Sequence, residues 1–264
     1  MSSSETTFLH FDECFAYQKK LVQDLHARLI DFTKLRGTSL YCSSEAFTTI
    51  QRALNKQTTG GLTLLGSGNY HYTTLALLLK IQHPFTLILF DHHTDLNAGR
   101  LSDMLSCGSW VHHAISTLQN LKKTIIIGPD PLSARNIPPF IRRQAVILSE
   151  NQLPDSATLL SLIPTTNVYI SIDKDVLSSH YAQTNWDQGQ MQLGTLCDLI
   201  RLILSGHFCS GMDICGEWPA QPHQHLNVET RRAMEINAYS NRRLAEVYRE
   251  NKNTPDIVRP GVLH

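Results

Sequence analysis

The stretch from Phe85 to Asp95, FTLILFDHHTD, constrains the fold more than any other part of the sequence. Its first six residues are large, apolar or β-branched, which is typical of a strand buried on both faces, as in a parallel sheet. Pro84 precedes the run, and Asn97 and Gly99 follow soon after it, so its length is about that of a strand. The run then ends abruptly in residues that can bind a metal ion.

Asp91, His93 and Asp95 alternate along this ending, so they point to one side if the backbone stays extended. Two carboxylates and an imidazole that converge there would lose hydration, and the carboxylates would repel each other, unless a cation neutralised them. Taken alone, this ending is equally compatible with a solvated loop.

Two further segments show the same design. The segment 168–175, VYISIDKD, places Asp173 and Asp175 at the end of an apolar strand, again two residues apart. The segment 62–71, LTLLGSGNYH, ends a strand in glycines and leads to His71. Because the carboxyl ends of strands in an open α/β sheet share one edge, where ligands bind, we expect the three endings to form one site.

The predicted site contains two imidazoles and four carboxylates, too many ligands for one tetrahedral zinc ion. They suit two divalent ions roughly 3.5–4 Å apart with carboxylates bridging them. Because these ligands include no thiolate, a hard ion such as Mn²⁺ is favoured over zinc, while affinity alone does not exclude Ni²⁺, Co²⁺ or Fe²⁺. A water held between two such ions loses a proton near neutral pH and becomes a nucleophile.

Segments with strand character alternate with segments of helical periodicity along the chain. This order predicts a three-layer α/β/α protein with a mainly parallel central sheet, and a length of 264 residues suits a single domain over 1–264. The expected strands are 62–66, 85–90, 124–128, 145–148, 167–172 and 208–214. The region before Gly60 has a less regular sequence pattern. We expect a helix over 15–29 there, with residues 29–32 as an alternative short strand.

Composition excludes several classes of function. Lys+Arg and Asp+Glu both number 23, so no bulk charge favours nucleic acid or a membrane surface. The six cysteines form no C-x-x-C pair, as is typical of reduced thiols. The first residues lack the pattern of a signal peptide, and no apolar stretch approaches the ~20 residues needed to span a bilayer. We therefore expect a cytoplasmic protein without nucleic-acid or membrane partners.

The motifs resemble those of the arginase and agmatinase (ureohydrolase) family. The family's Asp-Ala-His-x-Asp is matched by residues 91–95, its Ser-x-Asp-x-Asp by residues 171–175, and its Gly-Gly-Asp-His loosely by residues 66–71. The order and spacing also fit, and the resemblance extends from about 62 to 217. It implies an arginase-like fold and a metal-dependent hydrolase of linear amidines.

Carried over residue by residue, the resemblance implies two Mn²⁺ ions per chain bridged by Asp91 and Asp173. The remaining ligands are His71 and Asp95 on one ion, and His93 and Asp175 on the other. The implied reaction cleaves a C–N bond of a guanidino or amidino compound and releases urea through a metal-bridging hydroxide. The substrate would be a small guanidino molecule or an arginine in a peptide, and a homo-oligomer is expected.

Departures from the family pattern concern the substrate. The family's Asp-x-x-Glu supplies a carboxylate for the guanidinium, whereas this chain runs from Asp213 to Glu217 with one extra residue. We expect Gly216 to bend the chain and turn Glu217 toward the substrate, because glycine tolerates backbone angles that other residues do not. Lys174, between two metal-binding aspartates, should face away from the metals and form an ion pair.

Other candidates rest on weaker signals. Asn97 falls where arginases place an asparagine on the substrate's carboxylate, although it is equally typical of a turn. The family's proton-shuttling histidine is matched by His112 or His113. We also expect Asp95 to take part in catalysis. The last two candidates for substrate binding are Trp186 and Asp187. Trp186 would act as a lid on the substrate, or else it belongs to the packed core.

Two other interpretations of the protein's function stay open. A related deacetylase would need one zinc held by a smaller Asp-His-Asp set, which the six-ligand count disfavours. A metal-binding regulatory relative would keep the metals and lack turnover.

Overall fold

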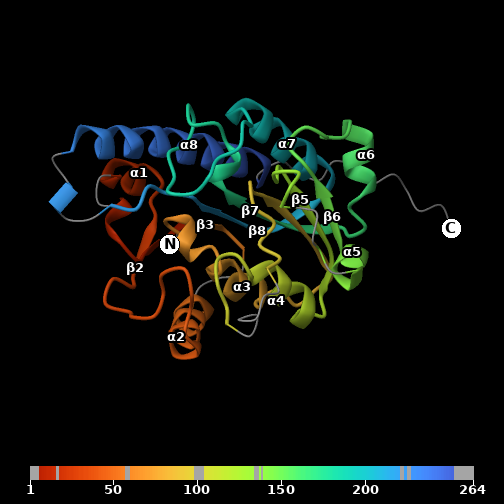
Figure 1. Cartoon of the computed structure of the whole chain (residues 1–264), viewed down its shortest axis with the longest axis horizontal. Helices are drawn as coiled ribbons and strands as arrows, with labels where there is room; N and C mark the ends of the chain where they lie inside the picture. Colours follow the sequence, from red (N-terminus) through yellow and green to blue (C-terminus); the bar gives the residue numbers. More distant parts are fainter. Residues whose placement is uncertain are drawn as a thin grey trace.

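The computed structural model describes residues 6–15, 18–56, 60–97, 104–133, 137, 139–220, 223–224 and 227–252. Its centre is one eight-stranded sheet of order β2-β1-β3-β8-β7-β4-β5-β6 (Figure 1). Every neighbouring pair is parallel. The strands are β1 (Thr6–His10), β2 (Arg28–Asp31), β3 (Leu62–Leu64), β4 (Phe85–Phe90), β5 (Leu121–Ile127), β6 (Ala145–Leu148), β7 (Asn167–Asp173) and β8 (Phe208–Cys215).

Helices cover both faces of this sheet, which confirms the predicted three-layer α/β/α architecture (Figure 1). One core lies under α2 (Ser44–Asn55), α3 (Thr73–Leu78), α4 (Trp110–Thr117) and α5 (Pro139–Gln144). The other lies under α1 (Lys19–Asp24), α6 (Ser156–Ser161), α7 (Leu193–Gly206) and α8 (Val228–Lys252).

The two faces of each central strand supply the two cores. In β4, Ile88 and Phe90 belong to the core under α7 and α8, whereas Leu87 and Leu89 belong to the core under α2 to α5. Every residue of β4 is buried, as the continuous apolar run predicted. The helices are correspondingly amphipathic: α2 buries Ala46, Ile50 and Leu54 at a spacing of four residues.

The strand order determines where the site forms. The chain places β4, β5 and β6 in succession and then returns to insert β7 and β8 between β3 and β4. The carboxyl ends of β3, β8, β7 and β4 therefore lie next to one another. The predicted metal ligands lie at or after the ends of β3, β7 and β4, and Glu217 follows β8.

The N-terminal region differs most from the expectation. β1 was not predicted, since Thr6, Thr7 and His10 hide the strand pattern, yet both threonines are buried beside β2 and β3. The expected helix over 15–29 is reduced to α1, and β2 occupies most of the alternative strand at 29–32. Among the helices that the structure describes, none is long and apolar enough to cross a membrane.

Candidate metal centre

Asp91 and Asp173 are brought together by the pairing of β4 with β7, in which Phe90 lies opposite Ile172. Each carboxylate is fixed through its Oδ1 atom by a backbone amide two residues further on. Asp91 Oδ1 accepts from the His93 N–H at 2.6 Å, and Asp173 Oδ1 accepts from the Asp175 N–H at 3.1 Å. Neither amide donates to the Oδ2 atom of its aspartate, so the amides leave this atom available as a ligand.

His71 reaches the same place from the short helix that follows β3 (Gly68–Tyr70). Its Nε2 lies 3.0 Å from Ser171 Oγ, and this hydroxyl donates to Asp213 Oδ1 at 2.8 Å. Because the Ser171 proton is directed to Asp213, the serine oxygen accepts from Nε2–H, so the neutral imidazole presents the lone pair of Nδ1. Asp213 thus fixes the imidazole tautomer through Ser171.

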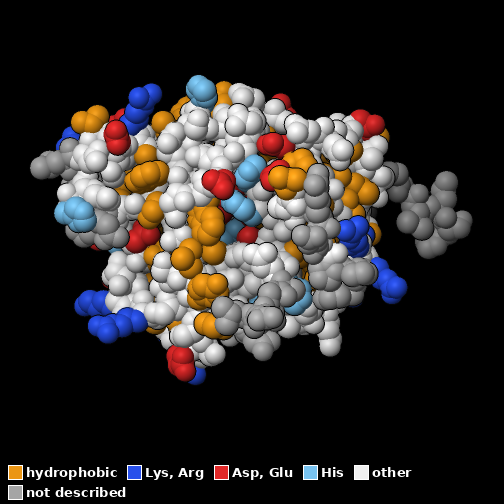
Figure 2. Space-filling view, viewed as in Figure 1, with side chains coloured by type: hydrophobic (Ala, Val, Ile, Leu, Met, Phe, Trp, Pro, Cys, Tyr) orange, Lys and Arg blue, Asp and Glu red, His pale blue; other side chains and the backbone are white. Residues whose placement is uncertain are grey.

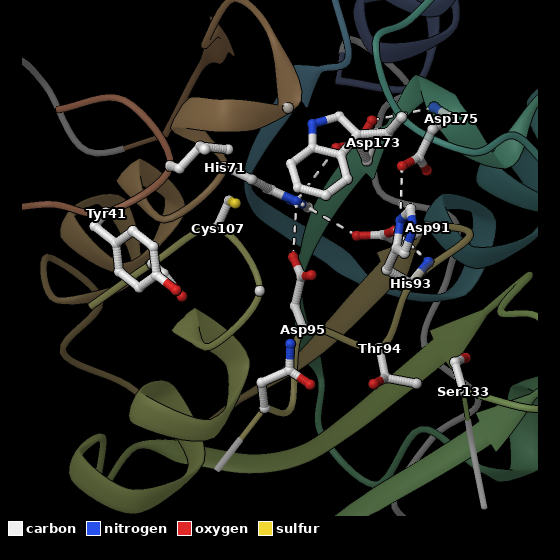
Figure 3. Close-up of a pocket in the computed structure, with 16 residues that line it drawn as sticks. Tyr41, His71, Asp91, His93, Thr94, Asp95, Cys107, Ser133, Asp173 and Asp175 are labelled. Carbon is white, nitrogen blue, oxygen red and sulfur yellow. Dashed lines mark hydrogen bonds and ion pairs between the residues drawn. The ribbon is translucent and has the colours of Figure 1, made fainter. Parts of the chain in front are cut away.

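A first cluster of ligand atoms surrounds His71 Nδ1 (Figure 3). This nitrogen lies 3.1 Å from Asp95 Oδ2, 3.4 Å from Asp91 Oδ2 and 3.6 Å from Asp173 Oδ2. Two ligands bonded at about 2.1 Å to one ion, at angles between a right angle and the tetrahedral value, lie about 3.0–3.4 Å apart. The distances from His71 Nδ1 to Asp95 and Asp91 are therefore those of ligands around one cation, and Asp173 lies slightly farther away.

A second cluster consists of Asp91, His93 and Asp175. His93 Nδ1 lies 2.9 Å from Asp175 Oδ2 and 3.5 Å from Asp91 Oδ1. The other oxygen of Asp175 accepts from the His92 N–H at 3.0 Å. The two clusters share Asp91, and Asp173 lies 3.6 Å from His71, so the structure brings together all six residues that the sequence proposed as metal ligands.

Burial and mutual repulsion dominate the electrostatics of these carboxylates. Burial, together with the charges of Asp175 and Asp91, raises the pKa of Asp173 to about 7. Burial and the charge of Asp91 raise the pKa of Asp175 to about 6. For His93, burial lowers the pKa, but hydrogen bonds to Asp175 and Asp91 outweigh it and raise the pKa to about 12. The site favours positive charge among its carboxylates.

Asp91 provides a further sign that a cation belongs here. It is 1% exposed, and its Oδ2 accepts no hydrogen bond. A buried carboxylate oxygen without a partner is costly unless a cation or an ordered water satisfies it. The residues present therefore fit divalent ions at this edge of the sheet.

The clusters form the floor of a cavity of about 350 Å³. Figure 2 shows histidine and acidic side chains near the middle of this face, beside a band of apolar ones. The residues that line the cavity besides the metal ligands are Leu40, Tyr41, Gly68, Thr94, Asn97, Ser106, Cys107, Gly108, Ser133 and Trp186. Leu40 and Tyr41 are 39% and 46% exposed, so the wall includes apolar surface open to solvent.

Of the remaining predicted residues, Asn97 and Trp186 line this cavity, whereas Asp187 is exposed and does not. His112 and His113 lie on α4 and do not border the cavity either. The loop before α4 instead contributes Cys107. Sequence reasoning missed Cys107 because it considered only histidines in this loop.

Glu217 does not point where the sequence suggested. It is buried, does not line the cavity, and accepts from Lys174 Nζ at 2.5 Å, Gln18 Nε2 at 2.7 Å and Asn241 Nδ2 at 2.6 Å. Lys174 is fully buried and forms the ion pair expected of it. The side chain of Glu217 is therefore held in a buried network away from the substrate space.

The bend at Gly216 explains this direction. Gly216 has φ +84°, and a Cβ built there would lie 2.5 Å from Asp173 Oδ1 and 2.7 Å from the Lys174 nitrogen. Glycine is required at this point because the backbone passes so close to Asp173. The bend exists as expected, but it turns Glu217 toward Lys174, so the expected orientation was wrong.

Comparisons with known proteins agree with this geometry. Residues 11–236 match the model of the Arginase family. An uncharacterised protein of Thermotoga maritima is 29% identical over 218 residues, which are 80% of this chain and 82% of that protein.

Solved structures are similar in fold at low sequence identity. Proclavaminate amidino hydrolase from Streptomyces clavuligerus is 16% identical with a TM-score of 0.64, covering 92% of this chain and 91% of that chain. Agmatine ureohydrolase of Thermoplasma volcanium is 14% identical with a TM-score of 0.65, covering 95% and 94%. Formimidoylglutamase from Bacillus subtilis is 14% identical with a TM-score of 0.65, covering 95% and 87%.

The chain belongs to the Arginase family, because the family match spans most of its length. The family and the fold predicted from the sequence are confirmed. The predicted enzyme class, a metal-dependent hydrolase acting on linear amidines, is that of the Arginase family.

The buried ion pair yields a first prediction. Lys174→Met leaves the Glu217 carboxylate buried without a cation, which typically costs about 3–5 kcal/mol of the free energy of unfolding. The double variant Lys174→Met/Glu217→Gln removes that charge and should recover part of the loss. Urea denaturation measures both, with the exposed Lys122→Met as control. A loss below about 0.5 kcal/mol for Lys174→Met would contradict the assignment.

A second prediction concerns pH. The raised pKa values of Asp173 and Asp175, from 3.8 to about 7 and about 6, mean that the folded metal-free chain holds these protons more tightly than the unfolded chain. Their contribution to the free energy of unfolding therefore falls as pH rises from about 4 through about 7. His93 adds a loss in the same direction at higher pH, because its raised pKa is about 12.

Accordingly, the melting temperature of the chelated protein should fall between about pH 5 and about pH 8, and added Mn²⁺ should raise it more at the higher pH. Thermal unfolding followed by circular dichroism, with and without metal, measures both effects. An equal metal-induced rise at the two pH values would argue against carboxylates as the metal ligands.

Proposed function

We propose that the protein is a dinuclear metal hydrolase, with Mn²⁺ as the expected ion, that cleaves a C–N bond of a small guanidino or amidino compound. The observation that carries this proposal is the pair of ligand clusters that share Asp91 on the floor of a cavity. The similarity to amidino hydrolases and agmatinases supports the reaction class.

The six proposed ligands divide into two sets. His71 and Asp95 would hold one ion, His93 and Asp175 the other, and Asp91 and Asp173 would serve both. Divalent ions bound there would lower the pKa of a water molecule and supply the nucleophile. Asp95 lines the cavity beside His71 and is the carboxylate that we propose to accept the proton of this water.

Substrate recognition must use groups other than Glu217. A guanidinium is planar and permanently charged, and aromatic faces attract such groups. Trp186 lines the cavity with its ring centroid 5.6 Å from that of His93, and Nε1–H donates to Asn69 Oδ1 at 3.2 Å, which fixes the ring. We therefore assign the amidine-binding surface to Trp186, with Asn97 as a polar contact on the same cavity wall.

The cavity volume favours a small molecule. At about 350 Å³ it lies near the lower end of ligand sites, about 300–1,000 Å³. A free guanidino compound fits this space better than an arginine side chain that brings a peptide backbone with it.

A third prediction tests the reaction. Protein loaded with Mn²⁺ should release urea, ammonia or formamide from a panel that contains arginine, agmatine, guanidino acids, formimino compounds and an arginine peptide. Asp173→Asn should bind fewer than two ions per chain and lose hydrolysis, because one carboxylate would serve both ions. The control is the exposed Asp198→Asn on α7. Mass spectrometry measures the number of metal ions per chain, and product assays measure hydrolysis.

Retention of two ions and full turnover in Asp173→Asn would overturn the ligand assignment. Two bound ions in the parent without turnover of any compound would instead favour the metal-binding regulatory reading over an enzyme.

A fourth prediction concerns Trp186. Trp186→Leu should lower kcat/KM about 3–30-fold, which corresponds to the 0.5–2 kcal/mol range of cation–π interactions. Trp186→Phe should retain part of the effect because it keeps an aromatic face, and Glu217→Gln should change kcat/KM less than Trp186→Leu does. Unchanged steady-state kinetics in Trp186→Leu would remove the indole from substrate binding.

A further inference from the structure

The thiol of Cys215 lies beside the first ligand cluster, in a separate group of possible metal ligands with His71 and Asp173. Cys215 ends β8 and is paired with Asp173, which ends β7. It is fully buried, its Sγ lies 3.1 Å from Asp173 Oδ2, and ligand atoms of Cys215, His71 and Asp173 all lie within 4.8 Å of one another. The expectation of hard ions assumed that no thiol was present among the ligands.

The spacing of these atoms suits coordination. A sulfur bonded at about 2.3 Å and an oxygen bonded at about 2.1 Å, at a right angle on one ion, lie about 3.1 Å apart. That is the separation between Cys215 Sγ and Asp173 Oδ2. A thiol–carboxylate hydrogen bond would give a similar distance, so the distance alone does not decide.

Two independent observations favour an ion at this point. The Nδ1 atom of His71 faces the same space, because its Nε2 is hydrogen-bonded to Ser171. The buried Asp91 Oδ2, 3.4 Å from that nitrogen, accepts no hydrogen bond. A hydrogen bond from Cys215 to Asp173 satisfies neither group.

We propose that Cys215 is a sulfur ligand of the ion that His71 and Asp173 would hold, in the metal centre that the proposed function requires. On binding, the thiol proton is released to water and a sulfur–metal bond forms, with no change of oxidation state. The neighbouring ion, held by His93 and Asp175, keeps only nitrogen and oxygen ligands. The ligands of the two ions therefore differ, because sulfur is a softer ligand than oxygen or nitrogen. The position beside Cys215 prefers Zn²⁺, Co²⁺ or Fe²⁺ to Mn²⁺.

Cys107 provides a matched control. It lines the same cavity and is half-buried, but it belongs to none of the His/Cys/Asp/Glu clusters found among the described residues. A thiol effect confined to Cys215 therefore separates coordination from the mere presence of a cysteine near the metals.

The test uses the full-length chain loaded with Co²⁺. The parent protein and Cys107→Ser should show a sulfur-to-cobalt charge-transfer band in the near ultraviolet, and Cys215→Ser should lack it. X-ray absorption at the cobalt or zinc edge should show a sulfur neighbour at about 2.3 Å in the parent. In competition between Zn²⁺ and Mn²⁺, the preference for Zn²⁺ should fall at least about tenfold in Cys215→Ser.

A cobalt spectrum without the band, or an absorption spectrum with only nitrogen and oxygen neighbours, would overturn the proposal and leave Cys215 as a hydrogen-bond donor to Asp173. If Cys215→Ser does not fold, the absorption measurement on the parent protein decides alone. These readouts need no substrate. A sulfur ligand without amidine hydrolysis would refute only the proposed function, and hydrolysis without a sulfur ligand would refute only this inference.

Discussion

Repulsion among buried carboxylates is the constraint on which this structure depends. The pairing of β4 with β7 places Asp91 and Asp173 side by side, and the residues that follow add Asp95 and Asp175 to the same edge. Burial and proximity raise the pKa of Asp173 and Asp175, so four ionised carboxylates are unfavourable there without positive charge. Backbone amides hold one oxygen of several of these groups, and the site becomes favourable when divalent ions occupy the space between the others.

Behind this edge, a second buried charge pair fixes the geometry. Alternation along the chain directs Lys174 away from the two aspartates that flank it, and the bend at Gly216 brings Glu217 to meet it. Gln18 and Asn241 also bond to Glu217, so the network joins the N-terminal region and α8 to the ends of β7 and β8. The carboxylate that the sequence predicted to face a guanidinium is thus part of a buried network behind the candidate metal centre.

The sequence predicted those parts that depend on local pattern. The apolar runs of β4 and β7 and the alternation of their endings were enough to locate the six proposed ligands, because parallel strands end at one edge. β1 was missed, since its buried threonines carry no apolar alternation. The direction of Glu217 and the approach of Cys215 to Asp173 depend on a bend and on strand register across distant segments. Neither can be derived from spacing along the chain.

A crystal structure of the metal-loaded protein, with anomalous diffraction to locate the ions, tests the central claim most directly. The account predicts two peaks roughly 3.5–4 Å apart, with Asp91 and Asp173 within bonding distance of both. A single ion, or two ions that share no carboxylate, would contradict it.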